Sequence, residues 1–366
     1  MSFARFLVAW RIFSRTLLAG VWLLSLVVTP ARGTTSEPTA ETVDTVAAYR
    51  LPDDPNDLLR IDNEMKAFFE ARIQRSASVD AKLDDIIDAI FGEKGLHFRY
   101  ESDGVYSVGE AFRRRRGNCL TFSFLVVAVA REFGIPAKFN EVTVEPRWMR
   151  TGKIVIASRH INVIVEIKNT SYELDVKLDD ELPVSRRSAC PVTDIRAFAG
   201  AYNGVGVQQL ALGNCDDGLK LIEKATFVDP TYVAGWTNLG NALVFVDRHE
   251  RAQQCFQRAL TIEPKSLAAL SGLASVCRKT GRISEAKKLE RMVIRYRERN
   301  PYYLLSLARD ELAKGKFDTA RSYLKRALNL KDNEVEFYQL MAEVARGQGH
   351  EKEAKRWLEK SKKVNS

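Results

Sequence analysis

The sequence predicts two parts with different folds: an α+β domain over residues 42–200 and an all-α repeat solenoid over residues 201–366. Apolar residues at helical spacing dominate the first part as far as about residue 136, and segments rich in Val and Ile follow. Helices that precede strands, instead of alternating with them, are typical of an α+β domain with an antiparallel sheet. The second part repeats at a fixed period, which predicts stacked helices.

The composition is that of a folded globular chain. Of 366 residues, 45% are hydrophobic and 28% are charged, a balance that excludes wholesale disorder. No run of 18 apolar residues lacks a charge, which excludes a protein that spans a membrane several times. The net charge is +9, but four arginines precede the first acid, Glu37, and no aromatic platform accompanies the remaining charge. No nucleic-acid partner is therefore expected.

Residues 1–33 have the three parts of a secretory signal. An Arg-bearing segment over 1–15 leads into the apolar stretch Thr16–Val28, and small residues precede a polar linker over 34–41. We expect cleavage near residue 34 and an exported protein, either periplasmic or secreted. The alternative is an uncleaved anchor that tethers the protein to a membrane, although an apolar stretch of 13 residues is short for a bilayer.

The five cysteines leave at least one thiol without a partner in the chain. Cys190 and Cys215 flank the junction of the two predicted parts, and they either form a disulfide or stay free. No pair of Cys or His residues has the spacing of metal ligands. No metal and no other cofactor is expected.

The repeat has a period of 34 residues. Large side chains lead its five units: Tyr202, Trp236, Leu270, Leu304 and Tyr338. Small residues follow four positions later: Gly206, Gly240, Ala274, Ala308 and Ala342. Prolines at 230 and 264 close the first two units, where a helix must stop.

This pattern resembles the tetratricopeptide repeat. The resemblance implies five helical hairpins stacked in a superhelix whose concave face binds a protein or peptide; a spacer that only holds the preceding domain is the alternative. The third unit departs most, because Glu290 and Val293 replace a large apolar residue and an alanine, and Asn300-Pro301 lies past the expected stop. Its second helix is expected to run longer or to pack less tightly.

Local signals divide the α+β part. Apolar periodicity predicts amphipathic helices around residues 59–69 and 83–90, and a capping box at Ser107 begins a short helix. A long apolar helix opens at Cys119 and ends at Gly134. Four strands are expected at Phe139–Val144, Lys153–Ala157, His160–Ile167 and Ser171–Val176.

Three reactive side chains fall at positions that favour nucleophilic chemistry. Cys119 begins a helix, where the dipole and the unpaired amides favour a thiolate. His160 begins a strand, and Asp175 lies near the end of the next one. If Lys168-Asn169 is a two-residue turn, Asn162 faces Asp175 and His160 is its diagonal neighbour on the same side of the sheet. The mechanism further requires the sulfur to lie in an accessible cleft.

The same residues resemble those of the transglutaminase-like, papain-related cysteine superfamily. The resemblance extends over residues 80–178 and includes the block Arg116–Cys119, the helix end Gly134–Ala137, His160 at the head of an apolar strand, and Asp175 after a leucine. It implies that Cys119 is the nucleophile, His160 the general base and acid, and Asp175 the orienting group.

The chain departs from this family at one position. Members often have an aromatic residue soon after the catalytic His, whereas this chain has Ile161-Asn162-Val163. No side-chain donor for an oxyanion is evident, so the backbone amide of Cys119 is the first candidate.

The preferred hypothesis is therefore an exported cysteine-dependent acyltransferase or amide hydrolase, similar to transglutaminases and cysteine proteases, whose repeats recruit a protein partner. The alternative is a non-catalytic adaptor that binds proteins through the repeats. The substrate, the partner, and the choice between hydrolysis and cross-linking stay open.

Overall fold

The computed structural model describes residues 23–27, 51–74, 78–101, 104–143, 148–151, 154–167, 170–175 and 188–364. They fall into two compact units. The first contains the described residues of 51–143 and 157–239, and the second contains those of 148–156 and 240–364. The predicted signal and linker lie outside the described residues, apart from strand β1 (Leu23–Val27). Within the described part of the chain, no helix is both long and apolar enough to cross a bilayer.

The helices over 63–70 and 79–91, which the apolar periodicity predicts, begin at capping residues. A 3-10 turn, η2 (Pro55–Leu59), precedes α2 (Asn63–Glu70) and α3 (Val79–Phe91). Asp62 caps α2 by accepting a hydrogen bond from the amide of Met65 at 2.9 Å, and Ser78 caps α3. Both helices bury their apolar faces in one core.

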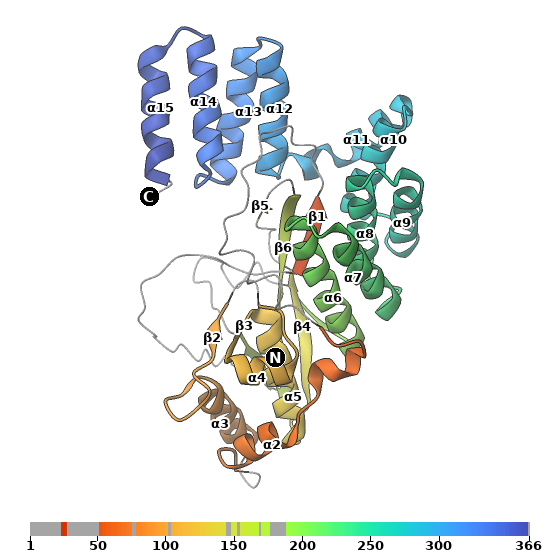
Figure 1. Ribbon diagram of the computed structural model, residues 1–366, viewed down its shortest axis with the longest axis vertical. Coiled ribbons are helices and arrows are strands. Elements are labelled where there is room, and N and C mark those ends of the chain that lie inside the picture. Colours follow the sequence, from red (N-terminus) through yellow and green to blue (C-terminus); the bar gives the residue numbers. More distant parts are fainter. Residues whose placement is uncertain are drawn as a thin grey trace. The chain divides into compact units, whose positions relative to one another are not determined.

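The long apolar helix α5 (Cys119–Glu132) is the centre of this core (Figure 1). All of its residues from 119 to 130 are buried, so it has no solvent-facing side over that length. The ring of Phe124 packs edge-on against Phe139 at a centroid distance of 5.5 Å. The short helix α4 (Val108–Arg114) precedes α5, and Gly134, with φ of +76°, allows the chain to turn after it.

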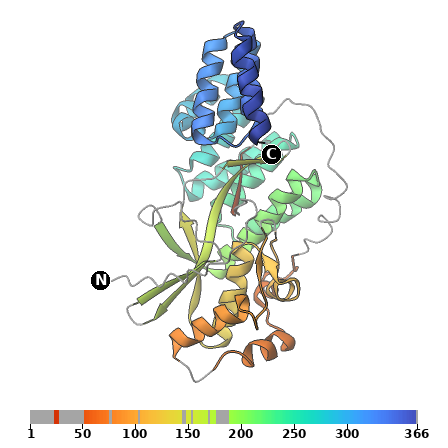
Figure 2. The ribbon, with the colours of Figure 1, turned by 90° about the vertical axis from the view of Figure 1, so that its left-hand side faces the viewer.

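The sheet has the strand order β1-β6-β4-β8, and β5 and β7 also pair with β6. Its strands are β4 (Ala137–Thr143), β5 (Trp148–Thr151), β6 (Ile154–Ile167), β7 (Thr170–Leu174) and β8 (Ser188–Val192). β4 pairs antiparallel with both β6 and β8, and β7 pairs antiparallel with β6. Figure 2 shows the long β6 among these strands.

Several features of the strands differ from the prediction, and β1 and β5 are among the strands that were not expected. The expected strands 153–157 and 160–167 are one continuous strand, β6, because no Gly or Pro interrupts the chain between them. β8 was not expected, since Pro191 cannot donate to a ladder, but an edge strand tolerates it. A parallel pair of two-residue strands, β2 (Arg99–Tyr100) and β3 (Arg116–Gly117), is too short to have a sequence signature.

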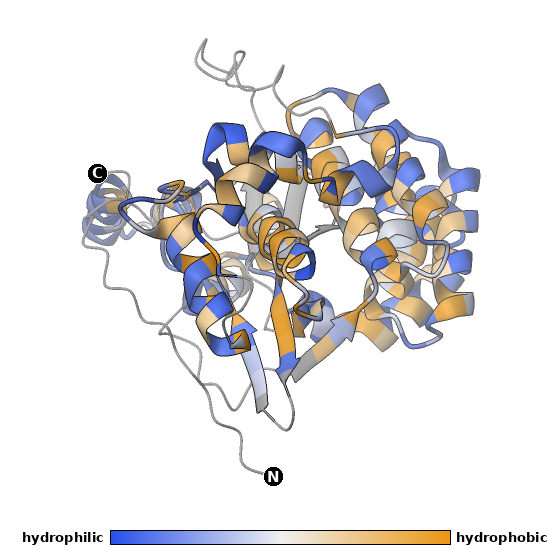
Figure 3. Ribbon diagram, turned by 90° about the horizontal axis from the view of Figure 1, so that it is seen from below, coloured by the Kyte–Doolittle hydropathy of each residue, from blue (hydrophilic) through white to orange (hydrophobic). Residues whose placement is uncertain are grey.

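Helices occupy the chain from residue 194 onward. They are α6 (Asp194–Ala211), α7 (Cys215–Val228), α8 (Val233–Phe245), α9 (His249–Ile262), α10 (Leu267–Lys279), α11 (Ile283–Arg297), α12 (Pro301–Ala313), α13 (Phe317–Leu330), α14 (Val335–Gly347) and α15 (Glu351–Val364). Figure 3 shows that the helices of the described chain contain both hydrophobic and hydrophilic residues. The fold is thus α+β followed by the predicted all-α repeats.

The small residues of the repeat mark close approaches between paired helices. A Cβ atom on Gly218 of α7 would lie 2.8 Å from the carbonyl oxygen of Gly206 on α6. Glycine is required there because the two backbones nearly touch.

The second helix of the third unit, α11, has 15 residues, whereas α9 and α13 have 14. This confirms that the helix runs longer.

Candidate active site

Cys119 is held at the first turn of α5 by its neighbours. The side chain of Asn118 caps the helix, and its Oδ1 accepts a hydrogen bond from the amide of Thr121 at 3.0 Å. The Thr121 hydroxyl donates to the carbonyl of Gly104 at 2.8 Å. A Cβ on Gly117 would come within 2.4 Å of the Thr121 side chain, so only glycine fits two residues before the thiol. The start of α5 is therefore rigidly placed.

The sheet brings His160 and Asp175 together. His160 is in β6, and Asp175 directly follows the last residue of β7. The imidazole Nε2 lies 2.5 Å from Oδ2 of Asp175. The β6–β7 register pairs Ile167 with Thr170 and Val163 with Leu174, which continues to Asn162 opposite Asp175. This is the register that a two-residue turn predicts, although the turn itself lies outside the described residues.

Cys119 reaches the same imidazole and forms a hydrogen bond with it. Because Nε2 is engaged by Asp175, the second ring nitrogen, Nδ1, is the atom left for the sulfur. Side chains from three elements thus meet at one ring: a helix start, a strand and the residue after a strand.

The surroundings of His160 favour its charged form. Burial of the ring lowers its pKa, but hydrogen bonds to Asp175 and Cys119, together with their charges, outweigh burial and raise the pKa well above the usual 6.5. Asp175 and Cys119 therefore both favour the imidazolium form of His160. The carboxylate that stabilises it is nearly inaccessible, with 4% of its side chain exposed, whereas 22% of the His160 side chain is exposed.

A second layer of polar groups supports Asp175. Asn162 Nδ2 donates to Oδ2 of Asp175 at 3.3 Å and to Oε1 of Glu173 at 2.6 Å. Its Oδ1 in turn accepts a hydrogen bond from Asn140 Nδ2 at 2.8 Å, and the two asparagines are paired in the β4–β6 register. Both are buried. Asn162 therefore connects the Asp175 carboxylate to a buried hydrogen bond with Asn140.

The thiol is less accessible than the mechanism requires. Cys119 is 1% exposed and belongs to the core cluster, whereas an open cleft at the sulfur was expected. The expectation was wrong for this structure because the residues around the start of α5 pack closely over it. The imidazole is the more exposed of the two groups.

Sequence reasoning missed the two groups that extend this network, Asn140 and Glu173. Their positions opposite or next to Asn162 in the ladders would identify them, but only once the register of both strand pairs is known. The side-chain nitrogen Nδ2 of Asn118, the residue before Cys119, is buried and has no hydrogen-bond partner within the described structure. Cys190 and Cys215, which could have formed a disulfide, are both free thiols.

The family model of the transglutaminase-like superfamily matches residues 69–173, a segment that contains Cys119 and His160. Residues 69–173 are a transglutaminase-like core. Asp175 lies two residues beyond the matched segment. The tetratricopeptide repeat model matches residues 233–266, which correspond to α8 and α9, so the chain joins a transglutaminase-like core to tetratricopeptide repeats.

Known proteins resemble the chain over limited segments. The Hsp70-Hsp90 organizing protein of Triticum aestivum is 31% identical over 75 residues, which are 20% of this chain and only 13% of that relative. Among solved structures, a thermophilic tetratricopeptide protein of Thermus thermophilus is 22% identical with a TM-score of 0.36; the match covers 45% of this chain and 91% of that one. PilF of Pseudomonas aeruginosa is 19% identical with a TM-score of 0.37, over 46% of this chain and 78% of that one.

Proposed function

We propose that the protein is an exported cysteine-dependent acyltransferase or amide hydrolase whose tetratricopeptide repeats recruit a protein partner. The observation that carries the catalytic part is the short contact of His160 Nε2 with Asp175 Oδ2, 2.5 Å, on an imidazole that also bonds to the Cys119 thiol. A thiol, an imidazole and a carboxylate in this order are the groups that nucleophilic acyl transfer needs.

In the proposed reaction the Cys119 thiolate attacks the carbonyl carbon of an amide. A carbon–sulfur bond forms, and the carbon–nitrogen bond breaks as the leaving amine takes the proton from the His160 imidazolium. Water or a second amine then attacks the carbonyl carbon of the thioester and gives its proton to His160. The carbon–sulfur bond breaks, and the products are the free thiolate and either an acid or a new amide. Asp175 fixes the ring orientation and stabilises the charged imidazole throughout.

Oxyanion stabilisation has two candidate donors beside the sulfur. The backbone amide of Cys119 lies at the start of a helix, where amides and the dipole favour negative charge. The buried side-chain nitrogen of Asn118, Nδ2, is the second. Because it has no hydrogen-bond partner in the described part of the chain, it is free to donate to a developing oxyanion.

Site-specific alkylation tests the triad. We would measure the rate at which iodoacetamide modifies Cys119 at neutral pH, mapped by mass spectrometry so that the other four free cysteines are read separately. His160→Ala and Asp175→Ala should each slow modification of Cys119 while leaving the rate at exposed Cys190 unchanged. An unchanged Cys119 rate in both variants removes the triad assignment.

The adaptor alternative is favoured by one observation, the 1% exposure of the Cys119 residue. An adaptor should keep its partners and its biological effect in a Cys119→Ala variant, whereas the enzyme should keep its partners and lose its effect.

Export is a separate proposal that rests on residues 1–33. Sequencing the amino terminus of protein recovered outside the cytoplasm decides between a cleaved signal near residue 34 and a retained membrane anchor.

A further inference from the structure

The third repeat has charged residues in two positions that most of the other units fill with apolar ones. Glu290 of α11 lies at a position that is apolar and fully buried in the first, second and fourth units. The residues there are Ile222, Phe256 and Leu324, each 34 or 68 residues from Glu290. Arg278 of α10 occupies the position of a leucine or valine in the first, second and fourth units. In the third hairpin, an ion pair therefore replaces an apolar contact.

This ion pair is extended by a second arginine. Arg278 binds Glu290 through Nε at 2.9 Å and through Nη2 at 2.6 and 2.5 Å. Arg297 approaches the same carboxylate at 3.6 Å and also donates to the hydroxyl and carbonyl oxygens of Ser271, each at 2.8 Å. Two guanidinium groups thus compensate one carboxylate, and the cluster is left with a net positive charge.

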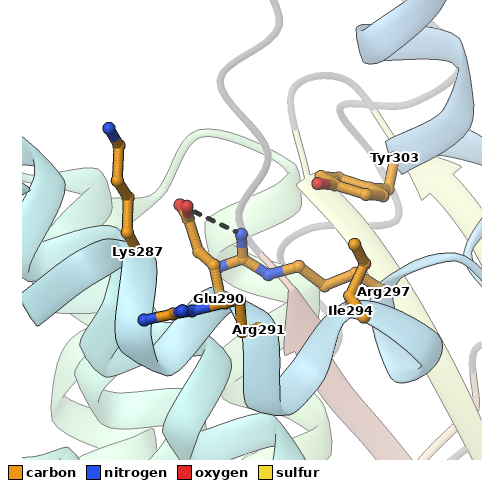
Figure 4. Close-up of a pocket in the computed structure, with 6 residues that line it drawn as sticks. All are labelled: Lys287, Glu290, Arg291, Ile294, Arg297 and Tyr303. Atoms are coloured by element: carbon orange, nitrogen blue, oxygen red, sulfur yellow. Dashed lines mark ion pairs between the residues drawn. The ribbon is translucent and has the colours of Figure 1, made fainter.

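A pocket of about 460 Å³ opens beside this cluster (Figure 4). It is lined by Lys287, Glu290, Arg291, Ile294, Arg297 and Tyr303. The first five come from α11, and Tyr303 faces them from α12. Three cations and one carboxylate line it, so its field attracts anions.

Two of the pocket cations are uncommitted. Lys287 and Arg291 are exposed, and within the described residues neither has an ion pair or a side-chain hydrogen bond. Their amino and guanidinium groups can bind carboxylates without losing an existing partner. Arg297 already binds Ser271 and Glu290 within the hairpin. It therefore adds positive charge to the pocket, while its N–H groups are largely used.

The pocket also has an apolar part. Ile294 is 50% exposed, whereas Thr226, two units earlier in the same register position, is 6% exposed. Ile294 and Tyr303 both line the pocket, so the Ile294 side chain and the Tyr303 ring can contact an apolar side chain of a ligand.

We infer that this pocket binds an acidic segment of a partner protein, in which carboxylates pair with Lys287 and Arg291 and one apolar side chain contacts Ile294 and Tyr303. The inference rests on the protein-binding part of the proposed function and is independent of Cys119. A nucleic acid fits less well, because the cations form a compact cluster with a single aromatic ring instead of a basic stripe with stacking platforms.

The test uses the full chain and a fluorescein-labelled peptide of six glutamates around one central leucine, with binding followed by fluorescence anisotropy. Lys287→Glu with Arg291→Glu should weaken binding by about tenfold or more, since two attractive charge pairs become repulsive. The matched control is Lys355→Glu with Arg356→Glu on α15. Both residues are exposed, the change in net charge is the same, and Lys355 lies two repeat periods after Lys287. This control should change binding less than about twofold, as expected for charges distant from the ligand.

Further measurements test the apolar contact, the folding of each variant and the competing ligand. Ile294→Ser should weaken binding of this peptide by about threefold but should not affect a counterpart with alanine in place of leucine. Circular dichroism must show unchanged helicity in each variant. Equal losses in the pocket and control variants, no binding by the native chain, or tighter binding of a single-stranded oligonucleotide than of the peptide would overturn the inference. Cys119 alkylation, measured on the same samples, reports separately on the proposed catalysis.

Discussion

Asn162 and His160 share one partner: Oδ2 of Asp175 lies 2.5 Å from the imidazole Nε2 and 3.3 Å from the Asn162 amide nitrogen. The asparagine is 1% exposed and is itself bonded by Asn140. A carboxylate held from two sides has little freedom to turn away from the imidazole. Asn162 therefore acts as a positioning residue for the proposed triad.

Replacing Asn162 tests this role. Asn162→Ala should slow iodoacetamide modification of Cys119 about tenfold, because losing one hydrogen bond to a charged group costs about 1.5 kcal/mol. The onset of the reaction should shift to higher pH, toward that of an ordinary thiol, since a less well oriented Asp175 stabilises the imidazolium less and the imidazolium in turn stabilises the thiolate less. Glu166→Ala, an exposed change on the same strand, is the control. A variant that loses thermal stability but keeps the native pH profile would show that Asn162 is only structural.

The imidazole governs how Cys119 reactivity depends on pH. In the native protein, modification of Cys119 should already be substantial near pH 6.5, because His160 has a raised pKa and supplies a positive charge beside the sulfur. In His160→Ala the rate should instead rise with the titration of an ordinary thiol, at about pH 8.5. Identical profiles for the two proteins would contradict the charge coupling.

Folding stability should also depend on the charge of His160. Its pKa is raised in the folded state, so the contribution to stability is complete below the unfolded-state pKa of about 6.5 and is lost as pH rises through the folded-state pKa. Urea unfolding of the native protein and of His160→Gln should therefore differ most at pH 5.5 to 6.5 and converge at higher pH. A difference that grows with pH would reverse the sign and refute the assignment.

The burial of Cys119 predicts size selectivity. Iodoacetamide, a small reagent, should modify both Cys119 and the exposed Cys190 in the native protein. A maleimide attached to a long polymer should label Cys190 but not Cys119, and it should label both in urea. Native labelling of the two thiols at equal rates by the polymer reagent would mean that the sulfur is open to solvent.

The close approach of α6 and α7 predicts a large effect of a small change. Gly218→Ala should destabilise the protein by about 1–3 kcal/mol, since the added Cβ would meet Leu210 at 2.7 Å and the Gly206 carbonyl at 2.8 Å. Gly204→Ala is the matched control on α6, because no atom lies within 4 Å of its Cβ position; helix propensity should make it neutral or stabilising. Thermal unfolding measures both, and equal destabilisation would argue against the close contact.

Much of the architecture was predictable from local signals. The cap at Asn118, the stop at Gly134 and the 34-residue period each depend on a few neighbouring residues or on simple repetition. The hairpin register also followed from a two-residue turn, and it places Asn162 opposite Asp175. The domain boundaries, the cleavage near residue 34 and the catalytic roles stay predictions.

Other features depend on contacts between distant segments. β8 exists because β4 offers it an edge, and β6 is fixed in the sheet by antiparallel pairing with both β4 and β7. The ion pair of Arg278 and Glu290 could be suspected from a charge at an apolar position, but its partner was not apparent from sequence.

By itself, the sequence determined which helices and repeats form and which three side chains are chemically suited to act together, because capping, periodicity and residue type are local properties. Only the tertiary structure decided that the Cys119 thiol is buried, that Asn162 supports Asp175 and that Arg278 pairs with Glu290 in the third hairpin. These depend on how elements far apart in the chain pack, and packing is set by complementary shape and charge that no single segment contains.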